Sequence, residues 1–209
     1  MIRQGRDFIA RHGETVFNVA RRLQGDAVHT PLTRAGFAQA DELGQTLRQL
    51  LGPRPALTLW ASPTGRALQT LAVIAEHLEL DWHGANTDPR LGEIGMGSWG
   101  GRLYSDVIGE AGPVVTPSGL LRVAPGGEDY HAIAKRCGGW LADTDADSGD
   151  RLVIMHGISS RVLRGVMTNA PIDADTGVPI ARGLPQGSLV LIENGQESVA
   201  HLGTGRAPA

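Results

Sequence analysis

Short apolar runs alternate with longer stretches of helical periodicity along most of the chain. Strand-like runs are predicted at residues 7–10, 57–61, 152–155, 188–192 and 198–202. Between the first four runs, apolar residues recur three or four positions apart, which is the spacing of one face of an α-helix. The pattern therefore predicts buried strands that are connected by amphipathic helices.

Four helices are predicted in these gaps. The first follows Thr33, a suitable N-cap, the second starts at Thr64, and the others cover residues 130–141 and 159–167. The pair Gly138-Gly139 is expected to weaken the third helix by about 1 kcal/mol per glycine relative to alanine. The expected buried faces are Ala40, Leu43, Leu47 and Leu50 in the first helix, and Leu68, Leu71, Ala75 and Leu78 in the second.

Strands that alternate with helices predict an α/β fold. The crossover connections impose a mainly parallel central sheet that is covered on both faces, which gives a three-layer α/β/α arrangement. A chain of 209 residues with 41% hydrophobic and 20% charged residues has the composition of an ordinary globular protein. We expect one domain over residues 1–209.

Composition and charge exclude several classes of partner and location. The formal net charge of -3 provides no broad basic field, so no nucleic-acid partner is expected. No stretch approaches the ~18 apolar residues that a membrane span needs, and no apolar signal region precedes the first strand. These patterns predict a cytoplasmic protein without a membrane partner. The single cysteine, Cys137, excludes an internal disulfide and a cysteine-based metal site.

Charged residues follow three of the predicted strands. Arg11-His12-Gly13 comes directly after the first strand, Arg66 follows the second, and His156-Gly157 follows the strand at 152–155. Ligands of parallel sheets bind beyond the carboxyl ends of the strands, so these groups are expected to converge on one rim. Arginine matches phosphate oxygens bidentately, and neutral histidine is a nucleophile, so the rim suits a phosphoryl group.

The chemistry that these residues could perform is phosphoryl transfer. Attack by His12 would give a phosphohistidine, while Arg11 and Arg66 hold the phosphate oxygens. An alkoxide leaving group also needs a proton, and Glu93, in a glycine-rich stretch, is the candidate donor. The scheme requires no metal and no cofactor, and no pair of histidines has the spacing of metal ligands on one helical face.

The chain resembles the histidine phosphatase superfamily, in the branch related to cofactor-dependent phosphoglycerate mutase. Five blocks stand in the family's order: Phe8 to Thr15 with Asn18, followed by Arg22 to Gly25 and Pro31 to Gly36; Ser62-Pro63 with Arg66; Leu91 and Glu93 with Gly97, Trp99 and Gly101; Gly127-Glu128; and His156-Gly157 with Arg161.

This resemblance implies the fold of the phosphoglycerate mutases and a role for each matching residue. His12 would be the nucleophile, Arg11, Arg66 and His156 would bind the phosphate, and Glu93 would donate the proton. The resemblance adds further phosphate contacts from Asn18, Gln24, Gly25 and Gly157. Two positions depart from the family's pattern, Met155 before the second histidine and Asp129 after Gly127-Glu128, and they put supporting hydrogen bonds and substrate preference in question.

Three functions are compatible with the resemblance, and hydrolysis of a small phosphate ester is favoured. A mutase needs extra cationic groups, but the segment at about 94–127, read as a substrate-specifying insertion, contains only Arg102 and Arg122. Met96 also replaces the tyrosine that mutases carry three residues past the acid. A mutase-type phosphotransferase remains the alternative. A non-catalytic phosphate-binding or regulatory module is disfavoured because all five core residues are present.

The physiological substrate and the oligomeric state cannot be deduced from the sequence. A homodimer is left open, because a dimer interface leaves no distinct mark in these helices. The roles of Arg102, Arg122 and Trp99 are also open, and Trp99 could either pack in the core or line the pocket. The other tryptophans are expected to be packing residues, at Trp60, Trp82 and Trp140.

Overall fold

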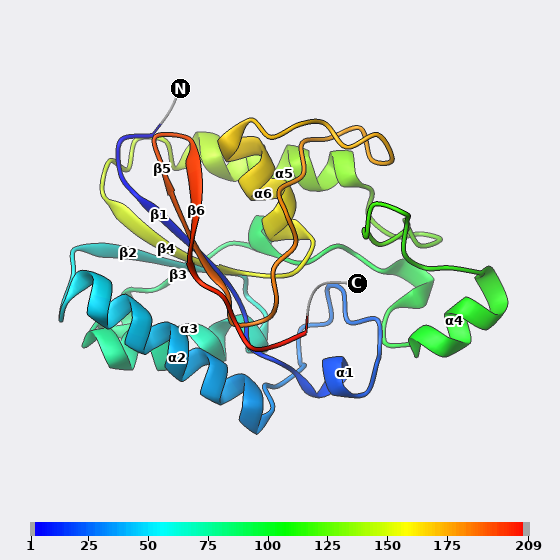
Figure 1. The fold of residues 1–209 in the computed structure, drawn as a ribbon, viewed down its shortest axis with the longest axis horizontal. Coiled ribbons are helices and arrows are strands. Elements are labelled where there is room, and N and C mark those ends of the chain that lie inside the picture. The colour runs from blue at the N-terminus through cyan, green and yellow to red at the C-terminus, as the bar shows by residue number, and fades with distance from the viewer. Residues whose placement is uncertain (1–2, 207–209) are drawn as a thin grey trace.

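A six-stranded sheet lies between two pairs of helices in the computed structural model, which describes residues 3–206 (Figure 1). Helices α2 and α3 cover one face and α5 and α6 cover the other. The strands are β1 (Asp7–Arg11), β2 (Leu57–Ala61), β3 (Asn86–Thr87), β4 (Asp150–Met155), β5 (Leu189–Glu193) and β6 (Gln196–His201). The α-helices are α1 (Val16–Val19), α2 (Arg34–Leu51), α3 (Gly65–Leu78), α4 (Tyr104–Ala111), α5 (Tyr130–Asp143) and α6 (Ser159–Thr168).

The strands are arranged in the order β3-β2-β4-β1-β5-β6. Strands β3, β2, β4 and β1 pair in parallel, whereas β5 runs antiparallel to both β1 and β6. The prediction of a mainly parallel α/β sheet covered on both faces is thus confirmed. The antiparallel part is a β5-β6 hairpin whose two loop residues, Asn194 and Gly195, both have positive φ, as a tight hairpin turn requires.

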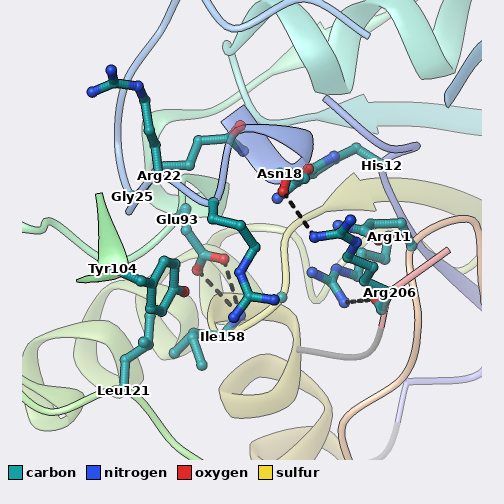
Figure 2. Close-up of a pocket in the computed structure, with 14 residues that line it drawn as sticks. Arg11, His12, Asn18, Arg22, Gly25, Glu93, Tyr104, Leu121, Ile158 and Arg206 are labelled. Atoms are coloured by element: carbon teal, nitrogen blue, oxygen red, sulfur yellow. Dashed lines mark hydrogen bonds between the residues drawn. The ribbon is translucent and has the colours of Figure 1, made fainter. Parts of the chain in front are cut away.

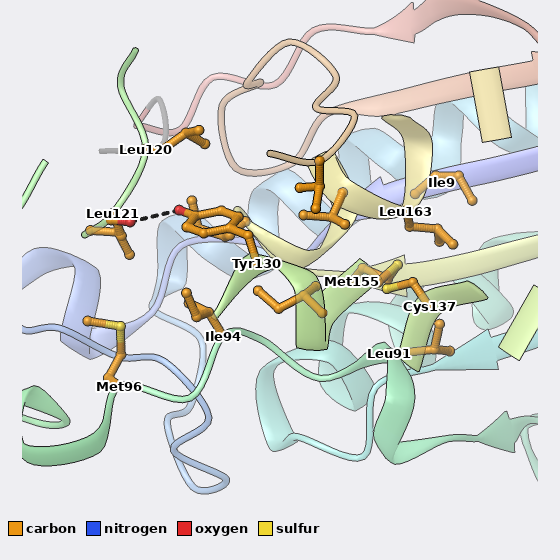
Figure 3. Packing of buried hydrophobic residues seen from close by; sticks show 14 of the residues in the cluster. Ile9, Leu91, Ile94, Met96, Leu120, Leu121, Tyr130, Cys137, Met155 and Leu163 are labelled. Atoms are coloured by element: carbon orange, nitrogen blue, oxygen red, sulfur yellow. Dashed lines mark hydrogen bonds between the residues drawn. The ribbon is translucent and has the colours of Figure 1, made fainter. Parts of the chain in front are cut away.

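Alternate residues of β1 supply two separate cores. Phe8 and Ala10 pack with α2 and α3, while Ile9 packs with α5 and α6. This two-residue period is what a strand covered on both faces requires. Figure 3 shows part of the second core, where the Tyr130 hydroxyl donates a 2.8 Å hydrogen bond to the carbonyl of Leu121. That bond fixes a residue which also lines the pocket described below.

The predicted helices are confirmed, with one error in a buried face. Thr33 caps α2 by accepting from Gly36 N, and Thr64 precedes α3 as expected. Leu50, however, is 55% exposed, whereas the next residue, Leu51, packs partly buried against the core, so the buried face of α2 continues four positions after Leu47 and not three. Helix α5 continues through both of its glycines. No helix in the described part of the chain is long and apolar enough to cross a membrane.

The short helix α1, helix α4 and strand β3 were not predicted. Helix α4 lies in the segment 94–127, and backbone hydrogen bonds tie the start of this helix to the loop after α1. Tyr104 N donates to the Arg21 carbonyl at 2.9 Å, and Leu23 N donates to the Arg102 carbonyl at 2.8 Å. The segment is therefore attached to the loop that follows the first strand, and both contribute to the same pocket.

Candidate active site

A pocket of about 280 Å³ opens at the carboxyl ends of β1 and β4, beside α1, α4 and the start of α6 (Figure 2). Most of the predicted site residues line it, as follows: Arg11, His12, Asn18, Gln24, Gly25, Glu93 and Gly157. Arg66 and His156 are fully buried next to the lining residues. The structure thus brings all nine predicted residues to one rim of the sheet.

Two histidines form the centre of the site. The rings of His12 and His156 lie edge to face, with centroids 5.2 Å apart. The Nδ1 atom of His12 lies 2.7 Å from the Gly13 carbonyl, which only accepts, so this nitrogen carries the proton and Nε2 has a free lone pair. The Nδ1 atom of His156 accepts from Arg66 Nε at 3.2 Å, so its Nε2 carries the proton. His12 can therefore attack an electrophile, and His156 can donate to an anion.

Burial keeps both imidazoles neutral. Burial lowers the pKa of His12 well below its ordinary value, and the positive charges of Arg66 and Arg11 lower it further. The pKa of His156 is lowered by burial and then by Arg66 and His12. A neutral His12 keeps its lone pair in mildly acidic solution, as a nucleophile requires.

Acidification is expected to destabilise the ligand-free protein through these two imidazoles. Their pKa values are depressed in the folded state but close to about 6.5 in the unfolded chain, so below about pH 6.5 the unfolded state binds more protons. The contribution of the two neutral histidines to the free energy of unfolding is fully present above about pH 6.5. Below that pH, this contribution falls by up to about 1.4 kcal/mol per histidine for each pH unit.

Thermal unfolding at about pH 7.5 and about pH 5.5 measures this effect. The His12→Asn variant, which cannot titrate at this position, is expected to lose less stability on acidification than the unmodified protein. Equal losses in the two proteins would contradict the assignment. The exposed His83 provides the control, since His83→Asn should reproduce the unmodified pH dependence.

The two arginines are oriented by carbonyl oxygens. Arg66 donates from Nη1 to the Ala27 carbonyl at 2.6 Å and from Nη2 to the Gly25 carbonyl at 2.7 Å. Arg11 donates only from Nη1, to the carbonyls of Leu184 at 2.7 Å and Arg206 at 3.2 Å. Its Nε is buried without a partner among the described residues. Arg11 therefore keeps the Nε and Nη2 edge of its guanidinium free, which is the edge that binds two oxygens of an oxyanion.

Both guanidinium groups remain cationic at neutral pH. Burial lowers the pKa of Arg11 and of Arg66 to about 10, and the negative charge of Glu93 acts against that shift. The small Gly157 lies against Arg11, since a Cβ at this glycine would be 3.2 Å from Nη2. Any larger residue here would press on the guanidinium that faces the pocket.

Two amides supply further donors to the pocket. The Oδ1 atom of Asn18 accepts from Thr15 N at 3.0 Å and from Thr15 Oγ1 at 2.8 Å. The Oε1 atom of Gln24 also contacts the Thr15 hydroxyl. With their oxygens directed at Thr15, both amides can point their NH₂ groups elsewhere. Gly25 has φ +48 and packs so closely on Met96 that a Cβ would clash, so glycine is required there.

Glu93 is fixed at the start of α6. Its Oε1 accepts from Ile94 N and Ser159 N, each at 2.9 Å, and from Ile158 N at 3.2 Å. Its Oε2 accepts only from Ile158 N, at 3.0 Å. The carboxyl group is thus oriented on the pocket wall (Figure 2), and Oε2 is the oxygen with room for a proton.

Arg21, Tyr104 and Arg206 are among the pocket residues that sequence reasoning missed. Arg21 comes from the loop after α1, Tyr104 from α4, and Arg206 from the segment after β6. The Arg206 side chain donates to the Asn18 carbonyl at 3.4 Å, and its own carbonyl accepts from Arg11 (Figure 2). No motif marks these residues, because each reaches the pocket through tertiary structure.

The residues left open in the sequence analysis have structural contacts. Trp99 is 5% exposed and packs in the core. Arg102 pairs with Glu110, and Arg122 donates to the carbonyls of Ala111 and Pro113, so neither arginine lines the pocket.

The two departures from the family's pattern also have structural contacts. Met155 is buried in the core, and Asp129 caps α5 by accepting from Ala132 N at 2.7 Å. Among residues 3–206, no group of three or more histidine, cysteine, aspartate or glutamate side chains is arranged to hold a metal ion.

Comparison with known proteins gives a family match over nearly the whole chain. The model of the histidine phosphatase superfamily (branch 1) matches residues 8–202. A relative from Yersinia pestis (strain Pestoides F), named probable phosphoglycerate mutase GpmB, is 29% identical over 174 residues, which cover 80% of this chain and 77% of the relative.

Solved structures of similar fold include phosphatases. A putative alpha-ribazole-5'-P phosphatase from Escherichia coli K-12 superposes with a TM-score of 0.70 at 22% identity and covers 96% of each chain. A mycobacterial glucosyl-3-phosphoglycerate phosphatase in complex with VO3 gives a TM-score of 0.74 at 22% identity, over 97% of this chain and 100% of that one. At these identities the superpositions establish a shared fold.

Proposed function

The chain belongs to the histidine phosphatase superfamily, branch 1, and on that premise we propose that it is a phosphomonoesterase that hydrolyses a small phosphorylated metabolite through a phosphohistidine on His12. The observation that carries the proposal is the neutral His12, whose Nε2 keeps a free lone pair, in the same pocket as Arg11, whose Nε and Nη2 have no partner among the described residues. A nucleophile and a bidentate oxyanion donor in one pocket are what attack on a phosphate ester needs.

In the first step, His12 Nε2 forms a bond to phosphorus while the bond from phosphorus to the alcohol oxygen breaks. Arg11, Arg66 and the Nε2 proton of His156 hold the equatorial oxygens, on which negative charge is spread. The amides of Asn18 and Gln24, the backbone at Gly25 and the close packing at Gly157 complete this cradle. With the phosphate dianion of the substrate bound beside it, Glu93 is proposed to carry a proton, which it transfers to the departing alkoxide.

In the second step, water attacks the phosphorus of the phosphohistidine. Glu93, now a carboxylate, accepts a proton from the water, and the bond between phosphorus and Nε2 breaks. The products are inorganic phosphate and neutral His12. Because Glu93 regains its proton, the enzyme returns to its starting state, and the cycle uses no metal or cofactor. We propose that residues 1–209 form a single domain and that the enzyme acts in the cytoplasm.

Hydrolysis is favoured over mutase chemistry by what the segment 94–127 adds to the pocket. It contributes Tyr104 and Leu121, which are uncharged, while its two arginines make contacts elsewhere. A bisphosphorylated intermediate would gain no charge partner from this segment. The partner we propose is therefore a small phosphate ester, with no nucleic acid.

Activity on an aryl phosphate is expected to survive an excess of chelator. The reason is that every catalytic group in the scheme belongs to the protein, so the removal of free metal ions removes none of them. Release of nitrophenol from p-nitrophenyl phosphate, with and without EDTA, measures this. Loss of turnover with chelator, and its recovery on adding a divalent metal, would overturn the scheme.

Phosphatase and mutase are separated by incubation with 3-phosphoglycerate and a trace of the 2,3-bisphosphate. We expect release of inorganic phosphate to exceed isomer formation, because the segment 94–127 adds no cationic group to the pocket to hold a bisphosphorylated intermediate. Predominant formation of 2-phosphoglycerate would identify a mutase instead.

A further inference from the structure

Arg21 is a pocket residue for which the proposed reaction has no use. Its side chain is exposed and lines the pocket, and the guanidinium carbon lies 6.0 Å from the centre of the Tyr104 ring. Within residues 3–206, this guanidinium forms neither an ion pair nor a hydrogen bond. Its neighbour Arg22 lines the same pocket but donates to the Gly101 carbonyl at 2.6 Å.

The backbone of Arg21 is held in an unfavourable conformation. Its φ is +54, in the left-handed region that favours glycine or asparagine. The conformation persists because Arg21 N donates to the Asn18 carbonyl at 3.2 Å and the Arg21 carbonyl accepts from Tyr104 N at 2.9 Å. The fold therefore keeps an arginine side chain at a position where a glycine would be less strained.

The pocket contains more positive charge than one phosphate group uses. Four arginines and a single carboxylate line it, in a chain with a net charge of -3. The carboxylate, Glu93, is already hydrogen bonded to the backbone at the start of α6 and forms no ion pair with an arginine. Several surface arginines outside the pocket, among them Arg48, Arg54 and Arg102, do have acidic partners.

The position of Arg21 corresponds to the alcohol side of the substrate. Glu93 would protonate the leaving oxygen, so the alcohol must extend from the phosphate past Glu93. Tyr104 lies on the opposite side of Glu93 from Arg11 (Figure 2), and its hydroxyl makes no hydrogen bond within the described residues. The region around Tyr104 thus offers a free guanidinium and a free phenol to the part of the substrate that leaves.

We propose that Arg21, assisted by the Tyr104 hydroxyl, binds a second anionic group on the alcohol part of the substrate. The inference rests on the proposed phosphatase function and narrows it: the preferred substrates are phosphate monoesters of alcohols that themselves carry a carboxylate or a second phosphate. Guanidinium binds both groups through paired N–H donors, so the shared chemistry is that of a planar cation facing an oxyanion.

Three substrates with the same carbon chain test the proposal. They are 3-hydroxypropyl phosphate, 3-(phosphonooxy)propanoate and propane-1,3-diol bisphosphate, which carry a neutral, a carboxylate and a phosphate end. We expect kcat/KM to be about 10- to 100-fold higher for at least one anionic substrate than for the neutral one, as expected for one charge-assisted contact. The two anionic substrates show which of the two groups is recognised.

In Arg21→Gln, the ratio of kcat/KM for the preferred anionic substrate to kcat/KM for 3-hydroxypropyl phosphate is expected to fall to about one. Arg102→Gln removes the same charge from outside the pocket and should keep the preference. Arg21→Lys should recover part of it. Absence of a preference in the unmodified enzyme, or its survival in Arg21→Gln, would overturn the role of Arg21.

Binding separates this proposal from the proposed function. Calorimetric titration of the His12→Ala protein with the same three compounds requires no turnover. Tighter binding of an anionic compound that is lost in the His12→Ala, Arg21→Gln double variant supports the subsite even if no monoester is hydrolysed. Equal affinities for all three compounds exclude it even if hydrolysis is fast.

Discussion

Replacing His12 with alanine is expected to lower kcat for every phosphate monoester by at least about 10⁴-fold, since a covalent pathway cannot proceed without its nucleophile. His156 cannot substitute for it. Its Nδ1 accepts from Arg66, so its remaining nitrogen is protonated and has no lone pair with which to attack phosphorus. The phosphate would still bind, because both arginines are held by carbonyl oxygens and not by His12.

Trapping of the covalent intermediate is the measurement that checks this expectation. Labelled substrate is mixed with enzyme, the reaction is quenched within one turnover, and the label on the protein is tested for the acid lability and alkali stability of a phosphohistidine. Label is expected on the unmodified enzyme and on the control His83→Ala, whose side chain is exposed. Label on the His12→Ala protein would show that another residue is the nucleophile.

The sequence predicted the layers of the fold because the burial of each element is periodic in the chain. Phe8, Ile9 and Ala10 form a continuous apolar run in the sequence, which is typical of a strand covered on both faces, and the structure places Phe8 and Ala10 in one core and Ile9 in the other. Leu50 shows the limit of the same reasoning. It stands three positions after Leu47, but the buried face of α2 continues at Leu51, four positions after Leu47, and a periodic pattern that permits both spacings does not show which residue is buried.

The catalytic candidates were predictable for a similar reason. Arg11 ends β1, and His12 and His156 directly follow β1 and β4, whose carboxyl ends lie together because these strands are parallel. The partners that orient them were not predictable, since Arg11 is held by carbonyls from residues 184 and 206, more than 170 positions away along the chain. Only the folded chain shows which donors of Arg11 remain free.

The arginines that line the pocket come from outside the segment at 94–127. Arg102 and Arg122 are the two arginines that the sequence offers in that segment, yet neither lines the pocket. Arg21 and Arg206 do, from the loop after α1 and from the chain end after β6. Their placement depends on a left-handed residue and on the return of the C-terminal segment, and neither feature leaves a periodic signal.

Replacing Glu93 with glutamine is expected to separate alkyl from aryl substrates. An alkoxide is a poor leaving group and needs the proton, so kcat/KM for 3-hydroxypropyl phosphate should fall by about 10²- to 10⁴-fold. A nitrophenolate leaves without protonation, so kcat/KM for p-nitrophenyl phosphate should fall by less than about tenfold. The ratio kcat/KM is the proper readout because it covers only the steps up to departure of the alcohol.

The same substitution is expected to change the course of the aryl reaction. Without the Glu93 carboxylate, water attacks the phosphohistidine slowly, so nitrophenol should appear in a burst of one equivalent followed by slow turnover. Rapid-quench or stopped-flow detection of nitrophenol measures the burst. Glu110→Gln, at an exposed carboxylate outside the pocket, should behave as the unmodified enzyme does. Equal losses of kcat/KM on alkyl and aryl substrates, in both Glu93→Gln and Glu93→Ala, would show that Glu93 orients the start of α6 and is not the proton donor.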